Sequence, residues 1–230
     1  MLVTVEGNIG AGKTTLINEL TRILGATLLP EPVQAKTFAT LLERYYEDPK
    51  RWGMTFQLDT IRARAVAHRL APNGLVLQDR SIIGDALFAQ VAHSQGFIDE
   101  TEYQVYLSLR DALTATLPPP AAIIYLQASP ETCRERITMR ARGCEAGVPL
   151  DYLTALHEAH EEMAEREKEN CLVVPWETFG SAEEVAARLC ERLEHKLRLD
   201  SPEVETLQGL PVARRRAAPM TIGTPREASA

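Results

Sequence analysis

Residues 7–14 read Gly7-Asn8-Ile9-Gly10-Ala11-Gly12-Lys13-Thr14 and fit the pattern G-x-x-x-x-G-K-[ST]. A short apolar run at residues 2–5 predicts a buried strand before this motif, and apolar residues at helical spacing follow it from Thr15. The glycines allow backbone N–H groups to approach phosphate oxygens at the positive end of a helix dipole. The motif therefore predicts that residues 7–15 bind nucleotide phosphates, with Lys13 at the β- and γ-phosphates and the hydroxyl of Thr14 on Mg²⁺.

The composition predicts one α/β domain at residues 1–200. The chain has 230 residues, 45% of them hydrophobic, and a formal net charge of −7, which disfavours binding to nucleic acid or to an anionic membrane. No apolar run approaches the roughly eighteen residues of a membrane span. Because the first predicted strand begins at residue 2, we expect no targeting peptide and a cytoplasmic location. Pro, Ala, Arg, Ser and Thr dominate residues 201–230, which predicts a disordered tail.

The cysteine and histidine patterns do not predict a metal site. The four cysteines, at positions 133, 144, 171 and 190, form no C-x-x-C pair, and we expect reduced thiols. His157-Glu158-Ala159-His160 is one residue short of the zinc motif H-E-x-x-H. We therefore interpret it as a solvated or interface face of a helix.

Two acids follow predicted strands directly. The strand at 26–29 runs into Pro30-Glu31-Pro32, where the prolines restrict the backbone around a carboxylate, and the strand at 75–78 ends on Asp79-Arg80-Ser81. The carboxyl ends of strands face the ligand crevice in open α/β sheets. Glu31 is thus a candidate general base, Asp79 a candidate Mg²⁺ ligand, and Arg80 a candidate phosphate clamp. A solvated turn carboxylate and a surface ion pair are the alternative interpretations.

Strands and helices alternate along the chain, which predicts a P-loop, doubly wound, parallel five-stranded sheet flanked by helices. The remaining strands are expected at 122–126 and 171–174. Helices are expected at 38–46, 52–70, 85–93, 99–117, from Ser129 onward, at 150–168 and at 183–197. The helix from Ser129 is basic, with arginines at 134, 136, 140 and 142. It is either a lid that neutralises the transferred phosphate or an ordinary solvated basic face.

Several stretches in consistent order resemble the deoxyribonucleoside kinase family. They are residues 6–13, 30–33, 46–57, 79–81, 124–133 and 140–152, so the resemblance covers the chain from residue 3 to about residue 160. It implies phosphoryl transfer from ATP, with Mg²⁺, to the 5′-hydroxyl of a deoxyribonucleoside, in a homodimer that supplies deoxynucleotides by salvage. It also implies an arginine-rich lid formed by Arg136, Arg140 and Arg142 over the ATP phosphates.

The resemblance implies roles for residues around the acceptor nucleoside. Glu31 takes the proton from the 5′-hydroxyl, and Arg80 lies near the 5′-oxygen. Gln57 reads the base, because an amide offers a donor and an acceptor together. The other implied contacts are Trp52 and Phe56 in the base pocket and Tyr46 and Glu145 at the 3′-hydroxyl.

The preferred base and the exact member of the family stay open at this point. Arg64 and Asp85 match an arginine–aspartate pair of deoxycytidine- and purine-preferring members, so we favour those substrates over thymidine. Asp79 stands where cellular members mostly have glutamate, but herpesvirus thymidine kinases use aspartate before the arginine. A leaderless chain suits a virus-encoded member such as a fish herpesvirus thymidine kinase. A thymidine kinase of broad specificity and a nucleoside monophosphate kinase using Arg44, Arg62 and Arg64 are the enzyme alternatives. A non-catalytic nucleotide-binding protein is the alternative of a different class.

Overall fold

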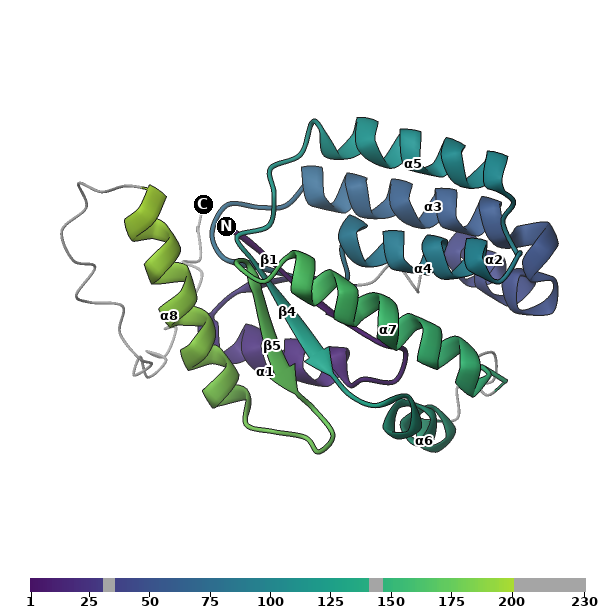
Figure 1. Ribbon diagram of the computed structural model, residues 1–230. Coiled ribbons are helices and arrows are strands. Elements are labelled where there is room, and N and C mark those ends of the chain that lie inside the picture. The colour runs from purple at the N-terminus through teal and green to yellow at the C-terminus, as the bar shows by residue number, and fades with distance from the viewer. Residues whose placement is uncertain (31–35, 141–146, 201–230) are drawn as a thin grey trace, which may run out of the picture.

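The computed structural model describes residues 1–30, 36–140 and 147–200 (Figure 1). A single five-stranded sheet runs through these residues, in the order β2-β3-β1-β4-β5, and its strands pair in parallel. The strands are β1 (Leu2–Gly7), β2 (Thr27–Leu29), β3 (Val76–Asp79), β4 (Ala122–Gln127) and β5 (Cys171–Pro175). The predicted parallel α/β sheet is confirmed, and each strand lies where the sequence predicts it.

Eight helices connect and cover the strands in the described parts of the chain. They are α1 (Lys13–Leu24), α2 (Lys36–Glu47), α3 (Pro49–Arg69), α4 (Ile82–Ser94), α5 (Glu100–Thr114), α6 (Pro130–Arg140), α7 (Leu150–Arg166) and α8 (Ala182–Asp200). Two of them begin three residues before the predicted start, because a side chain caps each one. Asp48 accepts the N–H of Arg51 at the start of α3, and Ser81 accepts the N–H groups of Ile83 and Gly84 at the start of α4.

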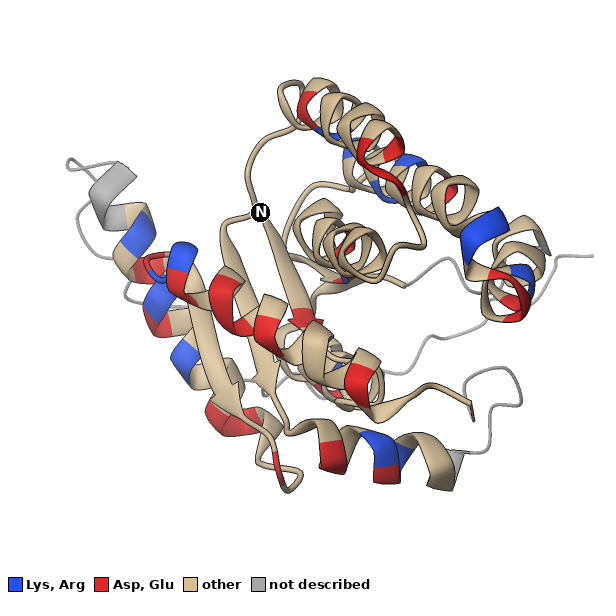
Figure 2. Ribbon diagram, turned by 45° about the vertical axis from the view of Figure 1, so that its right-hand side comes forward, with Lys and Arg blue, Asp and Glu red and all other residues tan. Residues whose placement is uncertain are grey.

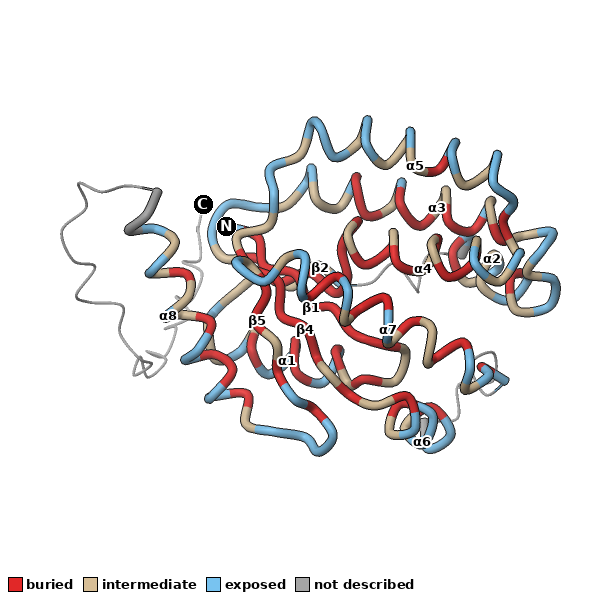
Figure 3. Tube along the Cα trace, viewed as in Figure 1, coloured by how far each residue is buried: buried red, intermediate tan, exposed pale blue. Residues whose placement is uncertain are grey.

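The strand β1 is the centre of the molecule. It pairs with β3 on one side and β4 on the other, and all six of its residues are buried. Helices α1 and α8 pack on each other and cover one face of the sheet, while α4 and α7 pack on each other over the opposite face (Figure 1). Helices α3 and α5 pack on α4 (Figure 1). Burial on both faces explains why the strands are almost continuously apolar (Figure 3).

The strand pairing brings the predicted functional segments to one edge of the sheet. Val5 of β1 lies opposite Asp79 of β3, and Gly7 lies opposite Leu126 of β4. The phosphate loop and the Asp79-Arg80-Ser81 segment therefore leave the sheet side by side. The crevice beyond the carboxyl ends of β1 and β3 is the place where open parallel sheets bind ligands.

The interpretation of His157-Glu158-Ala159-His160 as a solvated or interface face is wrong for His160. This side chain is fully buried, its Nδ1 lies 2.6 Å from the carbonyl oxygen of Leu156, and its ring stacks on Tyr125. Burial lowers the pKa of His160 to about 3, so the ring is neutral and its Nδ1–H donates to Leu156. His160 follows Leu153 and Leu156 at helical spacing on the face of α7 that enters the core.

The expectations on the cysteines, the tail and membrane-spanning helices concern single residues or segments. Cys133, Cys171 and Cys190 are free thiols, whereas Cys144 and the predicted tail at 201–230 lie outside the described residues. Within the described ranges, no helix has the length and the apolar character that crossing a membrane requires.

Candidate active site

The phosphate loop joins the end of β1 to the start of α1. Gly10 has a φ of +80°, and a Cβ at this position would lie 2.5 Å from the carbonyl oxygen of Cys133, so only glycine fits without a shift of the backbone. Gly12 is the N-cap of α1, with a φ of +98° and no side chain that could cap the helix. The first-turn N–H groups of α1, at the positive end of its dipole, are therefore left for an anion, as the motif predicts.

Buried hydrogen bonds from the side chains of Lys13 and Asn8 stabilise the conformation of the phosphate loop. The Nζ of Lys13 donates to the carbonyl oxygens of Gly7, at 3.1 Å, and Asn8, at 2.8 Å. The amide of Asn8 donates in turn to the carbonyl oxygen of Leu153 on α7 at 2.8 Å and accepts the N–H of Ile9. The ammonium group thus lies within the loop, and the loop is fixed to the helix beneath it.

Thr14 and Asp79, the two predicted Mg²⁺ ligands, lie in contact. The hydroxyl of Thr14 donates to Oδ2 of Asp79 at 3.2 Å. The other carboxylate oxygen, Oδ1, is buried and has no hydrogen-bond partner among the described residues. A hydroxyl beside a carboxylate oxygen that lacks a donor suits Mg²⁺, which prefers oxygen ligands and is usually bound by one or two protein groups together with water and phosphate.

Arg80 has an unusual backbone conformation. Its φ is +63°, and it is the one non-glycine residue with a positive φ in the described parts of the chain. Its N–H donates to Val5 of β1, and its guanidinium lies 4.5 Å from the centre of the Phe88 ring. Non-glycine residues adopt this region at a cost of about 1–2 kcal/mol, and such residues cluster at functional sites.

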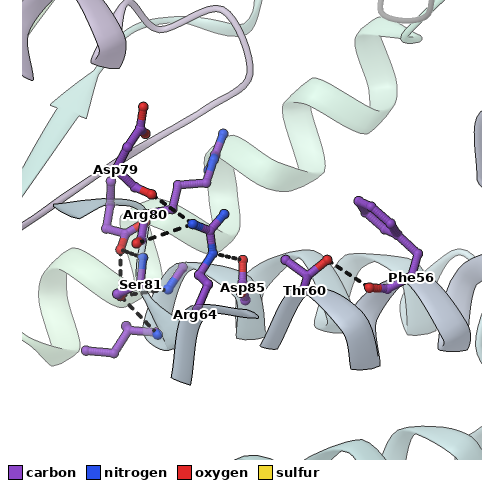
Figure 4. Close-up of polar contacts among 10 residues, drawn as sticks. Phe56, Thr60, Arg64, Asp79, Arg80, Ser81 and Asp85 are labelled. Carbon is purple, nitrogen blue, oxygen red and sulfur yellow. Dashed lines mark hydrogen bonds and ion pairs between the residues drawn. The ribbon is translucent and has the colours of Figure 1, made fainter. Parts of the chain in front are cut away.

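A buried ion pair lies next to this corner. Nε of Arg64 on α3 lies 2.7 Å from Oδ1 of Asp85 on α4, and the two side chains are 2% and 3% exposed. Nη1 of Arg64 also donates to the carbonyl oxygen of Asp79 at 2.8 Å and to that of Arg80 at 3.4 Å (Figure 4). The pair predicted from the sequence therefore forms, and it also supports the backbone that carries Asp79 and Arg80.

Gln57 lies two turns before Arg64 on the same buried face of α3. It is 1% exposed, and its Nε2 has no hydrogen-bond partner among the described residues. A buried amide donor without an acceptor destabilises a folded protein. We therefore expect Nε2 of Gln57 to donate to a group of a bound ligand. The neighbouring Thr60 donates its hydroxyl to the carbonyl oxygen of Phe56 instead (Figure 4).

Aromatic side chains from α2 and α3 surround this region. Phe56 stacks on Tyr45, with ring centres 5.2 Å apart, and also contacts Phe38. Trp52 is half-buried, and the guanidinium groups of Arg44 and Arg51 lie over its ring at 4.5 and 4.6 Å. Tyr46 lies half-buried beside Tyr45. Tyr46, Trp52 and Phe56, which the resemblance assigns to the sugar and the base, thus lie close together where α2 is followed by α3.

The predicted lid arginines are described only in part. Arg136 of α6 donates to three backbone carbonyl oxygens, those of Ala11, Trp176 and Glu177, at 2.9–3.0 Å. Its guanidinium lies 4.4 Å from the centre of the Phe179 ring, which is 60% exposed. The side chain of Arg140 and the residues Glu31, Arg142 and Glu145 lie outside what the structure describes, so their roles stay predictions.

Some residues of this site were not found from the sequence. Charged residues lie mainly on the helices (Figure 2), and the strands carry only Glu6 and Asp79. Glu6 is fully buried beside Ser81 and lies one residue beyond the strand predicted at 2–5, so the local sequence did not indicate it. Trp176 and Phe179 lie near Gly12, just beyond the carboxyl end of β5, where the rule that singled out Glu31 and Asp79 would have indicated them.

Comparison with known proteins shows the family to which the chain belongs. A family model described as deoxynucleoside kinase matches residues 3–198. The chain belongs to the deoxynucleoside kinase family. It is 36% identical to a probable deoxycytidine kinase of fowlpox virus, over 75% of each chain, and 33% identical to human deoxycytidine kinase, over 69% of this chain and 73% of the other. The structure of M. mycoides deoxyadenosine kinase with dCMP and dCDP bound is similar with a TM-score of 0.73 at 26% identity, covering 85% of this chain and all of the other.

Membership of the deoxynucleoside kinase family confirms the family predicted from the sequence, and with it the kinase activity. The protein is an enzyme that phosphorylates deoxynucleosides with a nucleotide as donor, the chemistry of deoxynucleotide salvage. The match extends over the phosphate loop, the ion pair and the aromatic side chains of α2 and α3 alike. It excludes the interpretation of the chain as a non-catalytic nucleotide-binding protein.

Proposed function

We propose that this kinase transfers the γ-phosphoryl group of ATP, with Mg²⁺, to the 5′-hydroxyl of deoxycytidine and purine deoxynucleosides in preference to thymidine. The buried ion pair between Arg64 and Asp85 carries the choice of base. It lies on the same side of α3 as the amide of Gln57, and these groups are shielded from water.

The chemistry of these three side chains fits an amino-substituted base. The carboxylate of Asp85 accepts hydrogen bonds only, so it suits the exocyclic amino group of cytosine or adenine. Thymine offers a carbonyl oxygen and a methyl group at the corresponding place, which would leave a buried carboxylate facing an acceptor. Mismatched buried polar groups discriminate between substrates far more strongly than a missing methylene does. Gln57, whose Nε2 has no partner among the described residues, supplies a donor and an acceptor for the ring edge.

The phosphoryl transfer itself depends on position and charge. Bound Mg²⁺, held through Thr14 and Asp79, would neutralise charge on the transferred phosphate. Lys13 and the first-turn N–H groups of α1 bind phosphate oxygens, and Arg80 stabilises the charge that develops near the 5′-oxygen. Glu31 accepts the proton of the 5′-hydroxyl, and the arginines of α6 and the segment after it shield the phosphates.

The contacts of the arginines near the site support a nucleoside, rather than a nucleoside monophosphate, as the acceptor. A nucleoside monophosphate kinase needs arginines that face the phosphate of its acceptor. Of the three candidates, Arg64 is paired with Asp85, and the exposed Arg62 is paired with Asp59. Arg44 lies over the ring of Trp52. Relatives named deoxycytidine kinase and a structural neighbour that holds dCMP support deoxycytidine in particular.

Initial rates test the proposal directly. Deoxycytidine, deoxyadenosine, deoxyguanosine, thymidine and their monophosphates are compared as acceptors with ATP and Mg²⁺. We expect deoxycytidine or a purine deoxynucleoside to be preferred over thymidine by at least roughly tenfold in kcat/KM, the discrimination of a buried polar mismatch. A preference for thymidine would refute the role of the ion pair, and the thymidine kinase alternative would stand.

The role of Glu31 needs a separate experiment. Replacing it with glutamine removes the base but keeps the size of the side chain. We expect Glu31→Gln to lower kcat by about 10²–10⁴-fold, with little change in the affinity for the nucleoside. Near-normal turnover would show that another group accepts the proton.

The homodimer implied by the resemblance belongs to the same proposal. Ile83, Ala86 and Gln90 lie at helical spacing on α4 and are only half-buried within one chain, so they offer a face for a second copy. Light scattering of the purified protein at micromolar concentration would give about twice the mass of one chain. A monomer at that concentration would refute this part.

A further inference from the structure

The segment Asp79-Arg80-Ser81 carries two of the proposed functional side chains, and its backbone is strained. Arg80 has a φ of +63°, a conformation that side-chain-bearing residues adopt only when the surroundings impose it. Other groups must therefore hold the peptide groups on either side of Arg80 in place. Fixing them fixes where the guanidinium of Arg80 and the carboxylate of Asp79 lie.

Arg64 holds one side of the segment. Its guanidinium donates to the carbonyl oxygens of Asp79 and Arg80 (Figure 4). Within the segment itself, the N–H of Arg80 donates to Val5 of β1 at 3.1 Å. These bonds restrain the carbonyl oxygens on both sides of Arg80, but they leave the N–H and the hydroxyl of Ser81 to be satisfied elsewhere.

Glu6 holds the other side. One carboxylate oxygen, Oε1, accepts both the backbone N–H of Ser81, at 2.8 Å, and its hydroxyl, at 2.6 Å. Glu6 is fully buried and precedes the first residue of the phosphate loop. One side chain therefore connects the loop that binds the donor phosphates to the corner that carries Asp79 and Arg80.

Gly84 leaves room for this carboxylate. The other oxygen of Glu6, Oε2, has no hydrogen-bond partner among the described residues and lies against Gly84 of α4. A Cβ at Gly84 would overlap Oε2 and lie 2.7 Å from the carboxyl carbon. Glycine in the first turn of α4 thus leaves space for the carboxylate of Glu6, at a helical position where alanine would otherwise be favoured.

We propose that Glu6 is a positioning residue for phosphoryl transfer, which holds the strained Asp79-Arg80-Ser81 corner in register with the phosphate loop through the two hydrogen bonds that Oε1 accepts from Ser81. The inference rests on the proposed roles of Asp79 and Arg80. The important property of Glu6 is that its Oε1 accepts the two hydrogen bonds from Ser81. A proton bound to Oε2 would leave both of these hydrogen bonds in place. A neutral side chain with an oxygen at the same place should therefore serve as well.

Substitutions at position 6 separate the acceptor from the charge. Glu6→Gln keeps an oxygen for Ser81, whereas Glu6→Met has a similar length and no acceptor. A displacement of about 1 Å in a catalytic group lowers turnover by up to ~10²-fold, so we expect Glu6→Met to lose about 10–10²-fold in kcat with the nucleoside KM within about threefold. Glu6→Gln should restore kcat to within about threefold of the wild-type value.

Gly84→Ala gives the same test without removing any polar group. Its Cβ displaces the carboxylate, and we expect the same loss of kcat at an unchanged nucleoside KM, so this variant decides the matter if Glu6→Met does not fold. Thr4→Val is the matched control. Thr4 is buried on the same face of β1, and its hydroxyl has no partner among the described residues, so kcat should not change.

The outcomes distinguish the inference from the function on which it rests. Wild-type kcat in Glu6→Met or in Gly84→Ala would overturn the inference. So would a loss in Glu6→Gln as large as that in Glu6→Met, because charge rather than the acceptor would then be required. Arg80→Met is measured in parallel. If Arg80→Met keeps its activity, the proposed role of Arg80 itself is wrong.

Discussion

The buried carboxyl of Glu6 should make the stability of this protein depend on pH in a direction opposite to that of most acids. Burial raises the pKa of Glu6 from 4.5 to about 7. The hydrogen bonds from Ser81 and the charges of Arg80 and Arg64 lower the pKa of Glu6, and the charge of Asp85 raises it, but burial outweighs them. Between pH 4.5 and about pH 7 the folded state therefore binds a proton here that the unfolded chain has released.

The size of the effect follows from the two pKa values. A pKa that is raised on folding stabilises the folded state fully below the unfolded value, and this stabilisation is lost as the pH rises through the folded value. With 4.5 for the unfolded chain and about 7 for the folded one, the stabilisation lost between pH 5 and pH 8 is about 2–3 kcal/mol. Glu6→Gln has no proton to lose, so the variant lacks this dependence although other carboxyl groups titrate in both proteins.

Urea unfolding at pH 5 and pH 8 measures the difference. The free energy of unfolding of the wild type, relative to that of Glu6→Gln, should fall by about 2–3 kcal/mol between the two pH values, or about 1 M in the urea midpoint. Glu158→Gln, at an exposed position on α7, serves as the control and should follow the wild type. If the wild type and Glu6→Gln differ by the same amount at both pH values, Glu6 does not titrate in this range, and the argument from burial is wrong.

The remaining predictions concern the ion pair, the loop and α6. Asp85→Ala leaves the guanidinium of Arg64 buried without its partner and should lower the free energy of unfolding by about 3–5 kcal/mol in urea titrations, whereas Arg64→Leu/Asp85→Ala should lose less and gain thymidine turnover relative to deoxycytidine. Gly10→Ala places a Cβ 2.5 Å from the carbonyl oxygen of Cys133 at a φ of +80°, so kcat/KM for ATP should fall by about 10–10²-fold, a strain of roughly 1–3 kcal/mol. Arg136→Met removes three hydrogen bonds to backbone carbonyl oxygens around the loop and should raise KM for ATP while leaving KM for the nucleoside unchanged; a parallel rise in both would contradict that placement.

Local sequence was sufficient for the elements but not for their order in the sheet. The motif at residues 7–14 specifies its own conformation, because glycine, lysine and threonine are each needed at one place in it. The order β2-β3-β1-β4-β5 depends instead on pairing between strands far apart in the chain, such as Val5 with Asp79. Asp79 could still be placed near the loop, because that inference needs only a parallel sheet with ligands beyond its carboxyl ends.

Glu6 was missed because its partners are distant in sequence. A glutamate at the end of a strand and next to a loop is usually solvated, and only the 75-residue separation bridged by its bonds to Ser81 shows otherwise. The same holds for Arg136, which the resemblance assigns to a lid over the phosphates. One of its carbonyl partners, Ala11, lies 125 residues away, and neither helix pattern nor charge indicates that contact.

The conformation of Arg80 shows why such a corner resists prediction from local preference. A turn that needs a positive φ would ordinarily contain glycine, which adopts it without strain, and nothing in the sequence Asp79-Arg80-Ser81 indicates a left-handed residue. Glycine would relieve the strain but would also remove the guanidinium that is proposed to act near the 5′-oxygen. The chain has arginine here and stabilises its backbone by two buried side chains, Arg64 on one side and Glu6 on the other. The strain is therefore tolerated where the side chain is needed, and the residues that make it tolerable lie on two different elements, α3 and β1.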